Sequence, residues 1–120
     1  MREGRHLDAV YKGIALLPRG NRPWLLATDF HHGRIDVYNS SFTRLRDLPS
    51  WMFSDPTLPA GYAPFNVAVI GGKVFVTYAK QDAARHDDSP GAEHGFIDVY
   101  GPGGHLLQRF ASRGRVNELL

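Results

Sequence analysis

The 120-residue chain contains no cysteine, which excludes disulfide bridges, a thiolate nucleophile and zinc sites built on cysteine. Long apolar runs are also missing: none approaches the ~18 residues that a membrane-spanning helix needs, and the first residues lack the apolar centre of a secretory signal. The 14 Lys and Arg residues are interleaved with 12 acidic residues, so the net charge is only +2 and no basic run exists. We therefore expect neither a membrane span nor a nucleic-acid partner.

What the chain does have is an internal repeat. The string HGRIDVY at residues 32–38 returns as HGFIDVY at 94–100, an offset of 62 residues. Two shorter pairs precede it, GIAL at 13–16 with NVAV at 66–69 (offset 53) and LLAT at 25–28 with VFVT at 74–77 (offset 49). Because the offsets change only between these segments, the length differences lie in loops. A copied unit of about 40 to 50 residues is typical of repeat folds such as β-propellers, and two copies of one ligand site are the alternative interpretation.

Each copy of the repeat predicts short strands. The matched segments are brief apolar runs, runs of β-branched and aromatic residues, or period-two alternations. Glycine and proline, with 13 and 8 residues, recur too often for a long amphipathic helix. The predicted strands lie near 13–17, 24–29, 34–38 and 42–47 in the first copy, and near 65–70, 73–79, 95–100 and 105–110 in the second.

The predicted fold class is all-β: two four-stranded antiparallel blades of an incomplete β-propeller, each with its earliest strand innermost. Because a propeller closes with about four to eight blades, two blades leave open strand edges and an apolar face. The chain is then a fragment, an open pair of blades, or a unit that self-associates or needs missing blades to close the ring. The predicted parts are an N-terminal stub (1–10), blade one (11–48), an inter-blade loop (49–61), blade two (62–110) and a tail (111–120) truncated before a third blade.

The repeated string also predicts roles for its polar residues. Its Ile and Val alternate along the third strand of each blade and should face a neighbouring blade, because successive side chains point to opposite faces of a sheet. Asp36 and Asp98 are expected to bond within the turns. Tyr38 and Tyr100 are expected to cap the strand ends.

The stretch from about Tyr11 to Arg115 resembles an uncharacterised family of bacterial β-propeller proteins, and LPAGYAPFNV (58–67) with YAKQDAARHDD (78–88) is its most specific part. The family resembles six-bladed NHL-like or TolB-like propellers, and some members carry a PEP-CTERM sorting tail. The resemblance implies an exported, extracytoplasmic propeller with no established activity. Members of the family are several hundred residues long and begin with a signal peptide, which this chain lacks. The chain resembles their N-terminal third.

Ligand-binding candidates come from strand alternation. In an antiparallel meander alternate connections emerge at the same end, so the irregular segments 29–33, 49–62 and 80–95 should gather on one face. Binding sites occur preferentially on such loops. The candidate ligand-binding residues are Asp29, His32, Tyr62 and Asn66. The structural alternative is that Asp29 bonds neighbouring loop amides and that Asn66 caps its own turn.

The segment 80–95 is also a metal candidate. Its carboxylates would suit calcium, and its imidazoles would suit a transition metal. No known ligand spacing is met, and the alternative is a solvated polar loop with Asx-type turns. The candidate ligands are Asp82, His86, Asp87, Asp88 and His94.

The composition indicates no catalytic residues. Scattered serines define no Ser-His-Asp order, and the acidic residues offer no preferred pair. The leading hypothesis is a non-catalytic propeller segment, a binding or scaffold module for an unknown ligand that requires no cofactor, with calcium as a possible one. The alternatives are a fragment of a metal-dependent propeller hydrolase or lactonase-like enzyme, and a truncated reading frame without activity.

Overall fold

The computed structural model describes residues 9–85 and 94–113, and these contain no helix. There is accordingly none in this part of the chain that is long and apolar enough to cross a membrane. The predicted all-β class is confirmed. The strands are β1 (Tyr11–Leu17), β2 (Trp24–Asp29), β3 (Arg34–Tyr38), β4 (Tyr62–Ile70), β5 (Lys73–Lys80), β6 (His94–Tyr100) and β7 (Leu106–Arg113).

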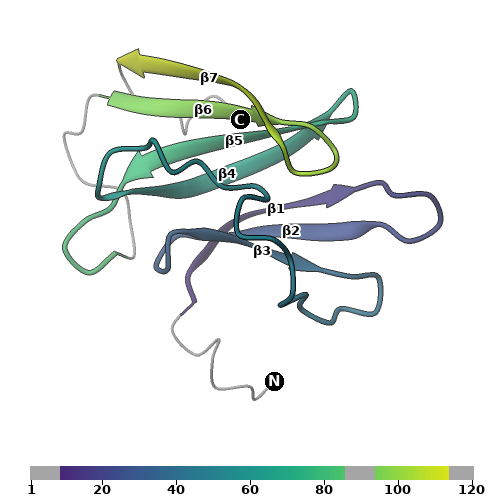
Figure 1. Ribbon diagram of the computed structural model, residues 1–120. Coiled ribbons are helices and arrows are strands. Elements are labelled where there is room, and N and C mark those ends of the chain that lie inside the picture. Colours follow the sequence, from purple (N-terminus) through teal and green to yellow (C-terminus); the bar gives the residue numbers. More distant parts are fainter. Residues whose placement is uncertain (1–8, 86–93, 114–120) are drawn as a thin grey trace.

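The strands form two antiparallel sheets, one of three strands in the order β1-β2-β3 and one of four in the order β4-β5-β6-β7. Each sheet is a simple meander whose earliest strand lies at one edge. Figure 1 shows β1 of the first sheet lying beside β4 of the second, so the two earliest strands are the ones that meet.

The fourth strand predicted for the first sheet, over 42–47, is wrong. The Asn39 side-chain oxygen accepts bonds from the amides of Ser41 and Thr43, at 2.9 and 3.0 Å, and this closes a tight turn after β3. Phe42 in that turn has φ of 62°, a left-handed conformation that no strand contains. The chain then makes a single bridge from Arg44 to Tyr38 and leaves the sheet. The first sheet is therefore three-stranded, since the residues that follow pack against the second sheet.

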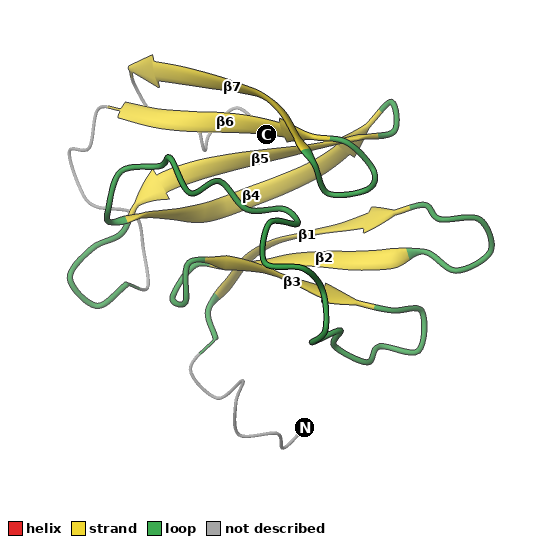
Figure 2. Cartoon of the chain, viewed as in Figure 1, coloured by secondary structure: helices red, strands yellow, loops and turns green. Residues whose placement is uncertain are grey.

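The residues that leave the sheet belong to the segment between β3 and β4, residues 39–61, here called the connector. Figure 2 shows the connector running from the end of β3 across to the second sheet. Phe53 in its middle is buried, and its amide donates to the carbonyl oxygen of Gly104, in the turn between β6 and β7, at 2.9 Å. The connector is thus anchored on the second sheet.

The two sheets repeat one another in register. Gly13 pairs with Thr28 as Asn66 pairs with Thr77, and both first strands have a bulge immediately before this pair. The two threonines even make the same bond, because the hydroxyl oxygen of each accepts from the amide opposite, at 2.9 Å and 3.1 Å. The repeat in the sequence is therefore a repeat in structure, with the offsets confined to loops.

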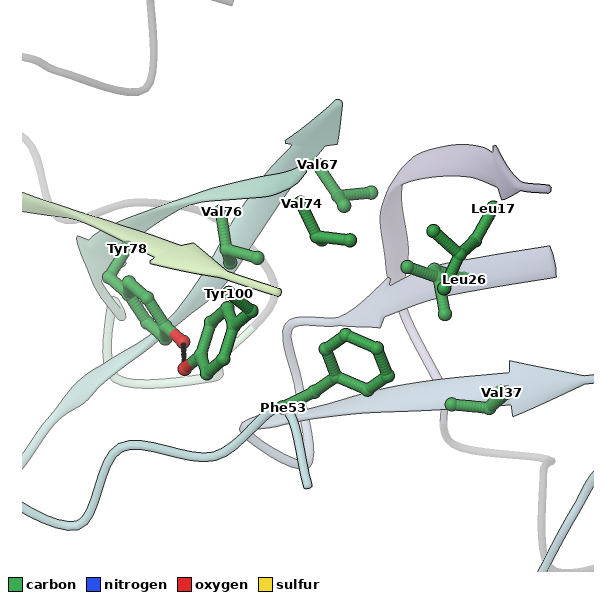
Figure 3. Packing of buried hydrophobic residues seen from close by; sticks show 9 residues of the cluster. All are labelled: Leu17, Leu26, Val37, Phe53, Val67, Val74, Val76, Tyr78 and Tyr100. Carbon is green, nitrogen blue, oxygen red and sulfur yellow. Dashed lines mark hydrogen bonds between the residues drawn. The ribbon is translucent and has the colours of Figure 1, made fainter. Parts of the chain in front are cut away.

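The core fills a wedge between the sheets. β1 makes the most extensive contact with β4, β2 less and β3 least, so the sheets meet at their earliest strands and diverge beyond them. Phe53 of the connector sits in the opening between Val37 of β3 and Tyr100 of β6 (Figure 3). The fully or nearly buried core is Leu17, Leu26, Val37, Phe53, Val67, Val74, Val76, Tyr78 and Tyr100, with Leu45, Leu48, Met52 and Leu58 of the connector packed against it.

Gly13 lies where the two sheets come closest. A Cβ atom on Gly13 would lie 3.0 Å from the Cα of Asn66 and 3.1 Å from the amide nitrogen of Val67, and would collide with the Asn66 side chain. The absence of a side chain at Gly13 is therefore a requirement for β1 and β4 to pack at this distance. A bond from the Thr28 hydroxyl to the Phe65 carbonyl oxygen, 3.0 Å long, fixes the same contact.

Candidate functional site

A cavity of about 510 Å³ lies between the connector and the second sheet. Its walls come from β3, from the connector, from the first residues of β4 and from Tyr78 of β5. The polar residues on its wall are Arg34, Asp36, Arg44, Arg46, Ser50, Ser54, Asp55, Tyr62 and Tyr78, and apolar ones include Leu45, Leu48, Met52 and Leu58.

Arginine dominates the charge on the β3 side of this cavity. The Arg34 Nε donates to Asp36 Oδ1 at 2.9 Å, and the Arg44 Nε lies 3.5 Å from the same oxygen. Arg46 is exposed on the connector and lines the cavity as well. Two guanidinium groups thus contact one carboxylate, and Arg46 adds a third positive charge, which leaves this wall positively charged.

Asp55 of the connector, which lines the cavity, is paired with a second buried carboxyl group behind the wall, that of Asp98 in β6. Asp98 is fully buried and Asp55 is 8% exposed. Among the described residues no amide or hydroxyl donates to Asp55 Oδ2 or Asp98 Oδ1, and Arg109 Nε lies 3.6 Å from Asp55 Oδ2 without a hydrogen bond. The two side chains are hydrogen-bonded to each other, which requires a proton on one of the carboxyl groups. Two adjacent buried carboxyl groups that share one proton are the stable arrangement at neutral pH, because two charges there would repel.

The pKa values of the pair are displaced in opposite directions. Burial, together with the hydrogen bond and the negative charge of Asp55, raises the pKa of Asp98 to about 7, against the opposing effects of Arg109 and Tyr100. For Asp55, burial favours a higher pKa, but the hydrogen bonds from Asp98 and Thr57 and the charge of Arg109 outweigh it and lower the pKa. Asp98 therefore holds the shared proton.

Two tyrosines complete this cluster. The hydroxyl groups of Tyr78 and Tyr100 lie 2.5 Å apart, and the Tyr100 hydroxyl donates to Asp98 Oδ2 at 3.3 Å. Burial is the main reason why the pKa of each tyrosine is raised, so both stay protonated. Of the cluster, Tyr78 and Asp55 reach the cavity wall. We call Tyr78, Tyr100, Asp98 and Asp55 the buried cluster.

The first sheet has an equivalent group on the repeat-equivalent face. It consists of Tyr11, Tyr38 and Asp36, and we call it the outer cluster. The Tyr11 hydroxyl donates to Asp36 Oδ2 at 2.7 Å and lies 3.0 Å from the Tyr38 hydroxyl. The predicted roles of these motif residues are partly wrong. Asp36 accepts from Tyr11 of β1, and Asp98 accepts from Tyr100 of its own strand, instead of bonding within the turns. Tyr38 and Tyr100 are the last residues of β3 and β6, as predicted, and they share a sheet face with the aspartates because positions two apart on a strand share a face.

Asp29 and His32, two of the predicted ligand residues, lie together but bond to each other. Fully buried Asp29 accepts at one carboxylate oxygen from the amides of Val10 and His32, each at 3.2 Å, and at the other from the His32 ring at 2.6 Å. Both oxygens are therefore used to close the turn after β2, so this geometry corresponds to the structural alternative.

The other two predicted ligand residues lie apart from this pair. Tyr62 lines the cavity and makes an edge contact with the Phe96 ring, with centroids 5.1 Å apart. The Asn66 side chain accepts from the amide of Val67 at 2.9 Å, inside the contact between β1 and β4. Of the four, Tyr62 alone is part of the cavity.

The irregular segments do meet at one end of the molecule. The Gln81 side chain donates to the carbonyl oxygen of Phe30 at 2.6 Å, and its backbone amide donates to that of Gly61 at 2.8 Å. A ring nitrogen of His31 lies 3.3 Å from the carbonyl oxygen of Arg85. The segments around 30, 61 and 81 therefore form one surface.

The metal candidates are only partly covered by the structure. His86, Asp87 and Asp88 lie outside the described residues, and only the backbone of His94 is described. Within the described part of the chain, no three residues of the metal-binding types come together. The calcium site in this loop stays a prediction, to be tested by titrating calcium and zinc into the protein and into an Asp87→Ala, Asp88→Ala variant.

Asp55 and Tyr78 were not identified as site residues from the sequence. One signal was present: Asp98 and Tyr100 are two residues apart on a strand, on the face where valines pack. A carboxyl group on an apolar face needs a polar partner, which predicts a buried polar cluster. No pattern identified the partner, because Asp55 comes from an irregular segment.

Among curated proteins, the chain is similar to three uncharacterised proteins of Acanthamoeba polyphaga mimivirus. It is 34% identical to one over 111 residues, 36% to another over 114 and 33% to a third over 112. These matches cover 88%, 91% and 91% of this chain but 19%, 29% and 27% of the relatives, so the chain spans less than a third of their length. No family model matches the sequence. No solved structure is similar to it either, and the resemblance to bacterial propeller proteins stays a prediction.

Proposed function

We propose that this chain is a pair of adjacent β-propeller blades that acts as a non-catalytic binding module, with the ligand held in the cavity beneath the connector. The observation that carries the proposal is the repeat in register: two successive meanders share bulge, pairing and threonine bond. They also meet at their earliest strands and diverge outward, which is how neighbouring blades pack around a propeller axis. The greater length of the relatives leaves room for further blades.

The cavity supplies the binding part of the proposal. Its volume of about 510 Å³ lies within the range of small-molecule sites, ~300–1,000 Å³. Arg34, Arg44 and Arg46 give one wall a positive charge, while Leu58 and Met52 give an apolar surface beside it. This combination fits a small anion with an apolar body, because guanidinium groups bind carboxylate and phosphate and the apolar wall excludes water.

In this proposal the buried cluster has no catalytic role. Its hydroxyl and carboxyl groups are already bonded to one another, and Asp98 does not line the cavity. A general acid or base must reach the proton that it transfers. The cluster therefore serves to anchor the connector, which forms the roof of the cavity.

Nuclear magnetic resonance titration tests this function. Aryl carboxylates, alkyl amines and neutral sugars are added separately to isotope-labelled protein, and we expect the carboxylates to shift amide signals from residues 44–58. Leu58→Trp, which fills the cavity, should remove the effect, whereas Leu107→Trp, at an exposed position 55% accessible outside it, should not. Shifts that survive Leu58→Trp, or no response to carboxylates, would contradict the proposed site.

A further inference from the structure

The first sheet exposes apolar side chains on the face that points away from the second sheet. Ile14 and Leu16 of β1 are each 61% exposed, and they share this face with Leu25 of β2 and with the outer cluster. We call it the front face. Side chains of this size on adjacent strands form a patch of the kind that marks an interaction surface.

The second sheet also exposes apolar side chains, on the face that points away from the first sheet. Ile70 at the end of β4 is 57% exposed, and Phe110 of β7 is 46% exposed. Phe75 of β5, which is partly exposed, lies on this face with Ala68 of β4 and Val99 of β6. We call it the back face.

The equivalence of positions between the two repeats indicates which surface each face would contact. Ile14 occupies the position of Val67, which is 5% exposed because the first sheet covers it. In the same way, Ile70 occupies the position of Leu17, which is fully buried against the second sheet. The two exposed faces are thus the repeat equivalents of the two faces that already pack together inside the molecule.

We propose that the front face binds the back face of a second copy of this chain, in a head-to-tail contact that reproduces the packing between the two sheets. The register supports this occupant, because each exposed face is the repeat equivalent of a face that already packs inside the molecule.

A head-to-tail contact predicts a specific pattern of association. Each copy has one front and one back face, so the contact is heterologous and can extend or close into a ring. This proposal rests on the proposed blade architecture, but not on ligand binding in the cavity. The carboxylate titration and the association experiment can therefore fail independently.

Sedimentation velocity and light scattering over a range of protein concentrations test the proposal. The wild-type mass should rise above the 13.4 kDa of one chain as concentration increases. Ile14→Lys with Leu16→Lys removes the front face, and Ile70→Lys with Phe110→Lys removes the back face. Each variant alone should stay at 13.4 kDa, whereas an equimolar mixture should form a complex of twice that mass, because each variant retains the face that the other lacks.

Phe42→Lys is the matched control. Phe42 is the most exposed of the large apolar residues, at 77%, and lies in the turn after β3, outside both faces. It should leave the association of the wild type unchanged. A wild type that remains monomeric at every concentration would overturn the proposal, as would a mixture of the two face variants that does not associate. Self-association of either face variant alone would indicate a symmetric contact and would overturn it as well.

Discussion

The buried cluster and the outer cluster derive from the same five-residue string, Ile-Asp-Val-Tyr preceded by one variable residue, yet they are in different environments. Asp98 and Tyr100 are fully buried under the connector. Asp36 has its carboxylate bonded to two cations and a tyrosine, and its neighbour Tyr38 is partly exposed. The difference lies in what covers each sheet. The environment of the motif residues therefore depends on whether a neighbouring element packs over them.

The largest difference in the free energy of unfolding is expected when the tyrosines of the two clusters are substituted. Tyr100→Ala should lower the free energy of unfolding by about 3–5 kcal/mol, because it removes a fully buried ring that packs against Phe53. Tyr38→Ala, at the equivalent position of the first sheet, should cost about 1 kcal/mol or less. Chemical denaturation of both variants measures the two values. Equal losses would contradict the view that burial distinguishes the clusters.

A second prediction concerns how closely β1 packs against β4. Gly13→Ala should destabilise the protein by about 1–3 kcal/mol, because the new methyl group collides with Asn66 and forces β1 away from β4. Gly101→Ala is the matched control, since its Cβ would lie 3.7 Å from the nearest atom of Leu107, an ordinary contact. Thermal unfolding followed by circular dichroism compares the two. A neutral Gly13→Ala would show that β1 and β4 are not closely packed.

A third prediction is a pH dependence of stability that the buried cluster produces. The pKa of Asp98 rises from an ordinary 3.8 to about 7 in the folded protein. Its protonation therefore stabilises the fold fully below the unfolded pKa. This stabilisation is lost progressively as the pH rises and is gone above the folded pKa. Asp98→Asn should remove this decrease in stability between about pH 4 and pH 7.

Asp55 has the opposite sign. Its lowered pKa stabilises the fold above the ordinary value of 3.8, and this contribution is lost as the pH falls below it. Denaturation at several pH values separates the two contributions. Asp36→Asn is the control, because it leaves the Asp55–Asp98 pair intact and should keep the pH dependence that the pair produces. An unaltered pH dependence in Asp98→Asn would contradict the assignment of the shared proton.

The strands were predictable where local pattern and tertiary environment agree. The segment Ile-Asp-Val-Tyr forms a strand in both copies, and the matched apolar segments pair in the same register. The prediction failed over 42–47, because the Asn39 turn and the departure of the connector into the wedge override a weak strand signal. Tyr62 was found because it precedes an inner strand. Asp55 was not, because its burial depends on the second sheet and not on its neighbours in sequence.

The bond from the Phe53 amide to the Gly104 carbonyl oxygen constrains how this sequence can change over time. The turn between β6 and β7 must keep its length and its glycine, because any side chain at Gly104 would meet Met52. The turn between β1 and β2 has no comparable contact at Gly20, because nothing lies within 4 Å of a Cβ at that position. Insertions and deletions among descendants of this chain should therefore accumulate around Gly20 and be eliminated around Gly104.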